Sequence, residues 1–124
     1  MKPIIKILAI FIPLVLFSPF IKSSESYPQI EITTTSGAFV IELDSNRAPK
    51  TVENFLKYLN SGFYKNTIFH RVIPGFVIQA GGYTVDLGEK ETLPEIINES
   101  GNGLTNQRMS IGMARTNEPH SASS

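Results

Sequence analysis

The chain has 124 residues, enough for one small domain and not for two. Its 11 basic and 11 acidic residues balance, so the sequence indicates no basic surface for nucleic-acid phosphates. It contains no cysteine, which excludes disulfides, thiolate chemistry and lipid attachment to an N-terminal cysteine.

The first 26 residues have the pattern of a secretory signal peptide. A short basic start leads into an unbroken apolar run over residues 7–17, and small residues precede Tyr27. An uncleaved membrane anchor is the alternative, although this run is shorter than the roughly 20 residues of a membrane span. Cleavage before Tyr27 would leave eight basic and ten acidic residues, and we expect no stable membrane association afterwards.

The next segments predict a β-hairpin followed by a helix. Two β-rich runs, residues 29–34 and 38–43, flank a turn that contains Gly37. After them Pro49 suits the first turn of a helix and Gly62 suits its end. Apolar residues at helical spacing between these two positions should pack on a sheet: Val52, Phe55, Leu56 and Leu59.

Residues 69–82, FHRVIPGFVIQAGG, are almost wholly apolar but contain Arg71 and Gln79. Pro74 and Gly75 predict a turn between two strands. A buried charge is costly unless it is paired, so Arg71 requires an explanation. One reading is an ion pair with an acidic residue at the rim of a barrel.

The remainder predicts fewer regular elements. Residues 81–103 are loop-like, and their four glutamates, loosely spaced and without histidine, are more typical of a solvated loop than of a metal site. Residues 109–114 predict a further short strand. The sequence then ends at Ser124 with no closing strand or helix. These features describe one domain, mainly β, with at least one helix.

Little conventional catalytic machinery is visible. His70 and His120 are the only histidines, no serine lies in a nucleophile-elbow setting, and no phosphate-binding glycine loop is present. A histidine placed like His70 is more often a hydrogen-bonded structural residue than a catalyst. Arginine is always charged, donates through a rigid fork and does not act as a general base. Arg71 therefore suits a reaction that needs a fixed donor but no proton transfer.

Rotation about an Xaa–Pro bond is such a reaction. Its barrier of about 18–20 kcal/mol comes from amide resonance. The twisted transition state loses that resonance, so the proline nitrogen regains a lone pair that accepts a hydrogen bond. A fixed donor beside an apolar slot for the pyrrolidine ring would stabilise the twisted form selectively.

The run from Phe69 to Gly82 resembles the signature of the cyclophilin-type peptidyl-prolyl cis-trans isomerases. Other segments follow in the order of that family, including residues 48–55, 61–64 and 113–116. The resemblance covers essentially everything after Ser26. It implies a mainly β domain built as a closed eight-stranded antiparallel barrel capped by helices.

The resemblance also implies the roles of individual residues. Arg71 matches the catalytic arginine, Phe76 the aromatic floor of the proline pocket, and Gln79 the glutamine that orients substrate and arginine. Val77 takes a position that is often methionine. Ala114 and Arg115 match the strand that pairs with the peptide before its proline, although many members have asparagine in place of Arg115. No metal or cofactor is implied, and the expected partners of this monomer are proline-containing segments of folding proteins.

In the family a Gln-Phe-Phe strand, an aromatic loop, further strands and a second helix follow the position of the serine-rich residues 121–124. We therefore expect residues 27–124 to be the N-terminal two thirds of an isomerase domain, with a naturally shortened variant as the alternative. Two functions follow: an isomerase for exported proteins, or an impaired fragment or peptide-binding module that lacks part of the proline pocket. The signal peptide and Met-Ala-Arg at 113–115 favour the bacterial periplasm over a eukaryotic secretory compartment.

Overall fold

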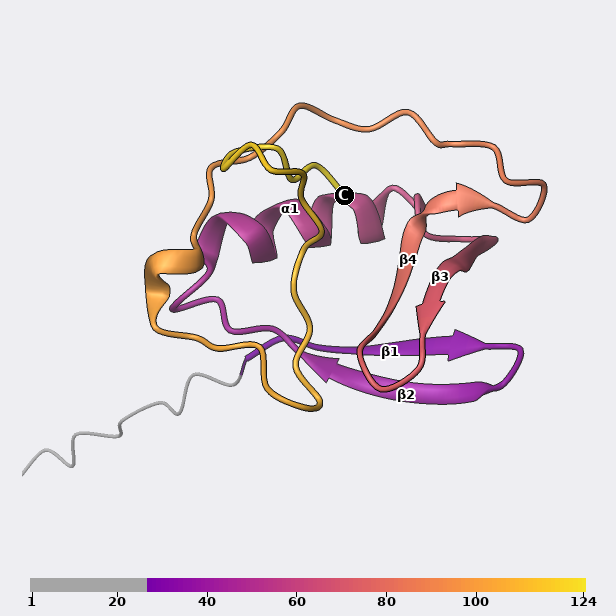
Figure 1. Cartoon of the computed structure of the whole chain (residues 1–124), viewed down its shortest axis with the longest axis horizontal. Helices are drawn as coiled ribbons and strands as arrows, with labels where there is room; N and C mark the ends of the chain where they lie inside the picture. The colour runs from indigo at the N-terminus through magenta and orange to yellow at the C-terminus, as the bar shows by residue number, and fades with distance from the viewer. Residues whose placement is uncertain (1–26) are drawn as a thin grey trace, which may run out of the picture.

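The computed structural model describes residues 27–124, and the signal-peptide prediction lies outside these residues. Strands β1 (Gln29–Thr34) and β2 (Gly37–Glu42) form an antiparallel hairpin with a two-residue turn (Figure 1). The Thr34 hydroxyl ties the turn together, because it donates to the Gly37 carbonyl at 2.8 Å and accepts from the Ser36 amide at 3.1 Å. The predicted hairpin is confirmed.

Helix α1 (Pro49–Asn60) lies along one face of this hairpin (Figure 1). Proline is its first residue, where the missing N–H breaks no intrahelical bond. Val52 is buried against Ile41 of β2 and against Leu43, the residue after β2. Four apolar neighbours pack around these three side chains: Ile30, Ile32, Phe55 and Leu56. The predicted packing of the helix on a sheet is therefore confirmed for Val52, Phe55 and Leu56, whereas the half-buried Leu59 lies outside this cluster.

The end of α1 is a Schellman motif. The Gly62 amide donates to the Leu59 carbonyl and the Phe63 amide to the Tyr58 carbonyl, both at 3.0 Å. Gly62 has a φ of +73°, which glycine adopts without steric strain. The rings of Phe63 and Tyr58 then pack with centroids 4.5 Å apart. Gly62 ends the helix as predicted.

Strands β3 (Thr67–Ile73) and β4 (Val77–Thr84) form a second antiparallel hairpin. The Phe76 amide donates to the Ile73 carbonyl at 3.1 Å, and Gly75 has a φ of +74°. Proline followed by glycine at positive φ is the pattern of a type II turn. The predicted turn at Pro74 and Gly75 is confirmed, and it brings the two strands of residues 69–82 side by side.

After β4 the chain is mostly irregular and crosses α1 (Figure 1). A short 3-10 turn, η1 (Ser100–Asn102), and an isolated bridge between Ile96 and Ala122 interrupt it. This segment is fastened to the helix by hydrogen bonds, such as the 2.7 Å bond from the Asn54 side chain to the Ser123 carbonyl. The loop predicted over residues 81–103 is confirmed from Val85 onward.

The strand predicted over residues 109–114 is wrong. Met109 has a φ of +70°, outside the extended region, and its side chain is 95% exposed. The Ser110 amide folds back to the Gln107 carbonyl at 3.1 Å, so residues 107–110 make a turn, and residues 111–114 are irregular. β-rich residues form a strand only beside a hydrogen-bonding neighbour, and no described strand lies in register with them.

The described part of the chain is mainly β with one α-helix. Its strands form two separate antiparallel pairs, and residues 27–124 by themselves close no barrel. Within this range no helix has the length and apolar character needed to cross a membrane.

Candidate active site on the β3–β4 hairpin

Arg71 and Gln79 face each other across the β3–β4 ladder. They are register partners, and the Arg71 Nη1 donates to the Gln79 Oε1 at 3.4 Å, a long hydrogen bond. The arginine is exposed, so its charge is not buried in a core strand. Among residues 27–124 Arg71 forms no ion pair with an acidic residue, and its polar partner there is an amide oxygen.

The register places apolar groups beside this pair. Val77 is paired with Ile73, and alternation along both strands puts these two residues on the same face as Arg71 and Gln79. Phe76 lies in the connecting turn with 76% of its surface exposed. The hairpin thus combines a cation, a polar acceptor and accessible apolar side chains within nine residues.

Ala114 and Arg115 lie elsewhere in the described chain, in the exposed irregular segment after residue 104. The Arg115 Nη1 donates to the carbonyl of its neighbour Thr116 at 2.9 Å. None of the hydrogen bonds within residues 27–124 links these two positions to Arg71 or Gln79. The structure therefore assembles four of the six predicted site residues on one hairpin and does not bring the other two to them.

The two histidines have different surroundings. The His70 ring packs on the Tyr83 ring with centroids 4.4 Å apart, and its buried Nδ1 has no hydrogen-bond partner among the described residues. Its predicted structural role thus depends on ring packing and not on a hydrogen bond. His120, for which no role was predicted, accepts a hydrogen bond of 2.9 Å at Nδ1 from the Asn98 backbone amide.

Comparison with known proteins supplies the family. Residues 29–124 match the family model described as cyclophilin type peptidyl-prolyl cis-trans isomerase/CLD. The chain belongs to this cyclophilin family. The match begins at the first residue of β1, so both hairpins and α1 lie inside it.

Several curated bacterial relatives agree with this assignment. The chain is 56% identical over 93 residues to peptidyl-prolyl cis-trans isomerase cyp18 of Streptomyces antibioticus, covering 75% of this chain and 56% of that protein. It is 46% identical over 123 residues to peptidyl-prolyl cis-trans isomerase A of Dickeya dadantii, covering 99% of this chain and 64% of the relative. For isomerase B of Escherichia coli the identity is 53% over 89 residues, covering 72% and 54%. The cyclophilin chain therefore spans between about half and two thirds of the length of these relatives.

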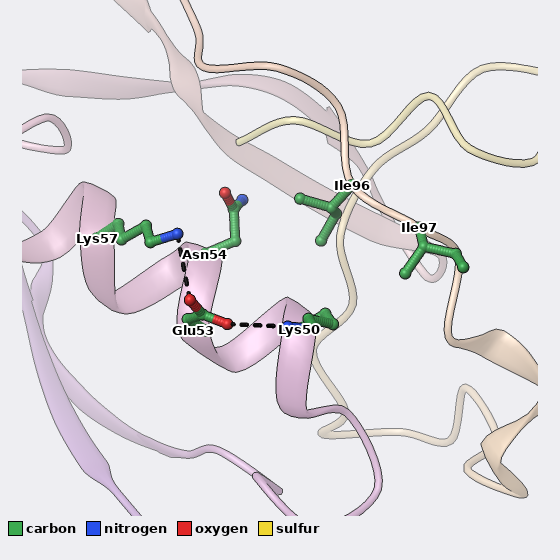
Figure 2. A pocket seen from close by; sticks show the side chains of 6 residues that line it. All are labelled: Lys50, Glu53, Asn54, Lys57, Ile96 and Ile97. Carbon is green, nitrogen blue, oxygen red and sulfur yellow. Dashed lines mark ion pairs between the residues drawn. The ribbon is translucent and has the colours of Figure 1, made fainter.

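The described cyclophilin domain also has an open pocket of about 210 Å³ beside α1, and none of the six predicted site residues lines it (Figure 2). Lys50 and Lys57 converge there on Glu53, with N–O distances of 3.5 and 3.2 Å. The hydrogen bond and the charge of Lys57 hold the pKa of the Glu53 carboxyl below its usual value, and the charge and hydrogen bond of Lys50 add to this effect. These exposed pairs at i,i+3 and i,i+4 spacing are ordinary helix-surface contacts.

The interpretation of Glu99 as part of a solvated loop is wrong. The Glu99 carboxylate accepts the Lys50 amide at 3.0 Å, the Thr51 amide at 2.8 Å and the Thr51 hydroxyl at 2.8 Å. It thereby caps the N-terminus of α1 from 48 residues away. Ala48, the N-cap residue, makes no side-chain capping bond, and this alanine before Pro49 was the available signal that a cap had to come from elsewhere.

Proposed function

We propose that the protein containing this chain catalyses cis-trans isomerisation of Xaa–Pro bonds, with the site on the β3–β4 hairpin. The observation that carries the proposal is the Arg71–Gln79 pair, held in register beside exposed Phe76 and half-buried Val77. The family match and the relatives named as peptidyl-prolyl cis-trans isomerases support it. The substrates would be proline-containing segments of folding proteins.

The chemistry follows from the charge of Arg71. As the amide twists, the proline nitrogen gains a lone pair, and a guanidinium donor stabilises that state more than the planar one. No proton needs to be transferred, so the site requires no histidine or carboxylate. Gln79 would keep the guanidinium in place through its Oε1, and Phe76 with Val77 would contact the pyrrolidine ring.

The proposed peptide contact at Ala114 and Arg115 rests on the resemblance to the family. An extended peptide would pair with the backbone of this segment just before the proline. The segment is irregular in residues 27–124, so the proposal requires it to become extended when peptide binds. Failure of an amide at Ala114 to gain exchange protection with bound peptide would contradict it.

For the fold we propose a closed eight-stranded barrel in which the two hairpins supply four strands. Val72 and Ile78 form a register pair on the face opposite Arg71, and they are 60% and 58% exposed. Large exposed apolar pairs on one side of a hairpin are typical of an uncovered core face. Closure by further strands would bury this face and leave Arg71 on the outside.

We also propose export to the periplasm, followed by action as a monomer on other exported proteins. The support is the sequence of residues 1–26, with its basic start and apolar run. N-terminal sequencing of the protein from a periplasmic extract tests this proposal. A mature terminus at Tyr27 is expected, and retention of Met1 in the membrane fraction would overturn it.

The activity is tested by comparing wild-type protein, as its gene encodes it, with Arg71→Ala and Arg47→Ala. Isomerisation of an Ala-Pro peptide is followed by protease coupling and by NMR exchange. We expect Arg71→Ala to reduce kcat/KM by about a hundredfold, because it removes the transition-state donor. Arg47→Ala removes the same charge at the entry of α1 and should leave the rate unchanged. Equal rates for wild type and Arg71→Ala would refute the assigned role.

A second function is favoured because no hydrogen bond within residues 27–124 joins Arg71 or Gln79 to the irregular segment at Ala114. In this alternative the chain binds proline peptides without turning them over. Residues 27–124 expressed alone distinguish the two functions. Peptide binding without acceleration of exchange supports the binding module, whereas a cooperative thermal transition together with isomerase activity refutes it.

A further inference from the structure

The β3–β4 ladder is irregular immediately next to Arg71. Phe69 pairs with Ala80 and Arg71 pairs with Gln79, so one residue of β3, His70, has no counterpart on β4. On the other side of the Phe69–Ala80 pair, Thr67 pairs with Thr84. There β4 has three residues where β3 has one. His70 is therefore the extra residue of a β-bulge, and the second irregularity has the opposite sense, with its extra residues on β4.

The bulge decides which face of the hairpin carries Arg71. Gln79 and Ala80 are neighbours on β4 and point to opposite faces. Paired residues share a face, so Arg71 lies on the face of Gln79 and Phe69 on the face of Ala80. In a regular strand Phe69 and Arg71, two residues apart, would share one face. The extra residue at His70 thus separates the cation from the phenyl ring.

His70 is also the residue that joins the two irregularities. Its ring packs on Tyr83, which is one of the additional residues of β4, with centroids 4.4 Å apart at an angle of 47°. The Nδ1 atom is buried without a hydrogen bond among the described residues, although leaving a buried polar atom without a partner is unfavourable. The ring is therefore held by packing against Tyr83 and not by a polar contact.

We propose that His70 is a positioning residue for the proposed isomerase site: its contact with Tyr83 locks the bulge that directs Arg71 toward Gln79. The role belongs to the shape of the ring, because neither nitrogen is needed to hold the contact. A phenyl ring at position 70 should pack on Tyr83 in the same way and hold the bulge. An alanine should leave the bulge free to shift and the guanidinium free to leave the face of Gln79. This inference rests on the proposed function only for its kinetic consequence.

The geometry is tested first without any activity measurement. NMR of wild type, His70→Ala and His70→Phe reports cross-strand contacts between residues 71 and 79 and the order of the Arg71 guanidinium. We expect His70→Ala to lose these contacts while the β1–β2 hairpin keeps its own, and His70→Phe to retain them. Unchanged contacts and guanidinium order in His70→Ala would overturn the proposal, whether or not the protein is an isomerase.

The kinetic arm uses the isomerase assay with the same variants and a double-mutant cycle. Misplacing a catalytic group by about 1 Å lowers rates up to about a hundredfold, and we expect about a tenfold loss of kcat/KM in His70→Ala with recovery in His70→Phe. In an Arg71→Ala background, His70→Ala should have no further effect, because there is no guanidinium to place. An equal tenfold loss in both backgrounds would show that His70 acts apart from Arg71. An inactive wild type would refute the proposed function and leave the NMR result standing.

Discussion

Removal of the Glu99 carboxylate should weaken the attachment of the irregular segment to α1. The three hydrogen bonds from Lys50 and Thr51 converge on this one side chain. Loss of a capping side chain is unfavourable by about 1 kcal/mol. Loss of a negative charge at a helix N-terminus adds about 0.5 kcal/mol. We therefore expect Glu99→Ala to lower the free energy of unfolding by about 1.5 kcal/mol.

The charge contribution gives this prediction a pH dependence. Partial burial alone would raise the pKa of Glu99, but the bonds from the Lys50 and Thr51 amides and the Thr51 hydroxyl, with the charge of Lys50, together lower it. A folded-state pKa below the unfolded one stabilises the protein above the ordinary glutamate range near 4.5. That stabilisation is lost as the pH falls through the lower folded-state pKa. The difference between wild type and Glu99→Gln should thus be largest near neutrality and vanish in acid.

The assay combines urea unfolding with hydrogen exchange at the Lys50 and Thr51 amides, which report the cap directly. Glu95→Ala is the matched control, because Glu95 is an exposed glutamate of the same segment. Glu99→Ala should accelerate exchange at both amides, whereas Glu95→Ala should not. If Glu99→Ala and Glu95→Ala gave equal unfolding energies and equal exchange at the two amides, the capping argument would be refuted.

Two further predictions concern the contact between β4 and the aromatic cluster at the end of α1. Gly81 has a φ of +104°, and a Cβ there would lie 3.2 Å from a Tyr64 ring carbon. We therefore expect Gly81→Ala to lower the melting temperature, with Gly101→Ala as the unhindered control. An unchanged melting temperature in Gly81→Ala would contradict this prediction. Burial, with a smaller effect of Tyr58, raises the pKa of Tyr64 to about 12. Because the unfolded tyrosine ionises near pH 10, the free energy of unfolding should fall between about pH 10 and 12. Tyr64→Phe should reduce that fall in alkaline unfolding curves. Parallel curves for wild type and Tyr64→Phe would exclude a contribution of Tyr64.

The elements predicted correctly are those whose signals are local. The β1–β2 hairpin follows from alternation around a short turn, and α1 follows from its apolar stripe between Pro49 and Gly62. The Pro74–Gly75 turn fixes that β3 and β4 pair, and pairing brings Arg71 opposite Gln79. Each of these conclusions needs only residues that are close in the chain.

The features that sequence reasoning missed depend on partners far along the chain. Glu99 is an ordinary loop glutamate until the fold places it at the N-terminus of α1, 48 residues away. The strand predicted over residues 109–114 needed a neighbour that residues 27–124 do not provide. The bulge at His70 has no local sequence signal such as a turn residue, and the Tyr83 ring that packs on His70 lies 13 positions later. Tertiary contacts, and not local propensity, decide these positions.

The bulge also changes how the charge in residues 69–82 is to be understood. A regular strand with its apolar residues against a core would have placed Arg71 on the same side as Phe69. The extra residue lets the chain keep apolar residues at nearly every position and still present one cation on the other face. Val72 and Ile78 then share the face opposite the cation, so any strand that covers them leaves Arg71 accessible. Core formation and access of a peptide to Arg71 are thus compatible because one residue is inserted between Phe69 and Arg71.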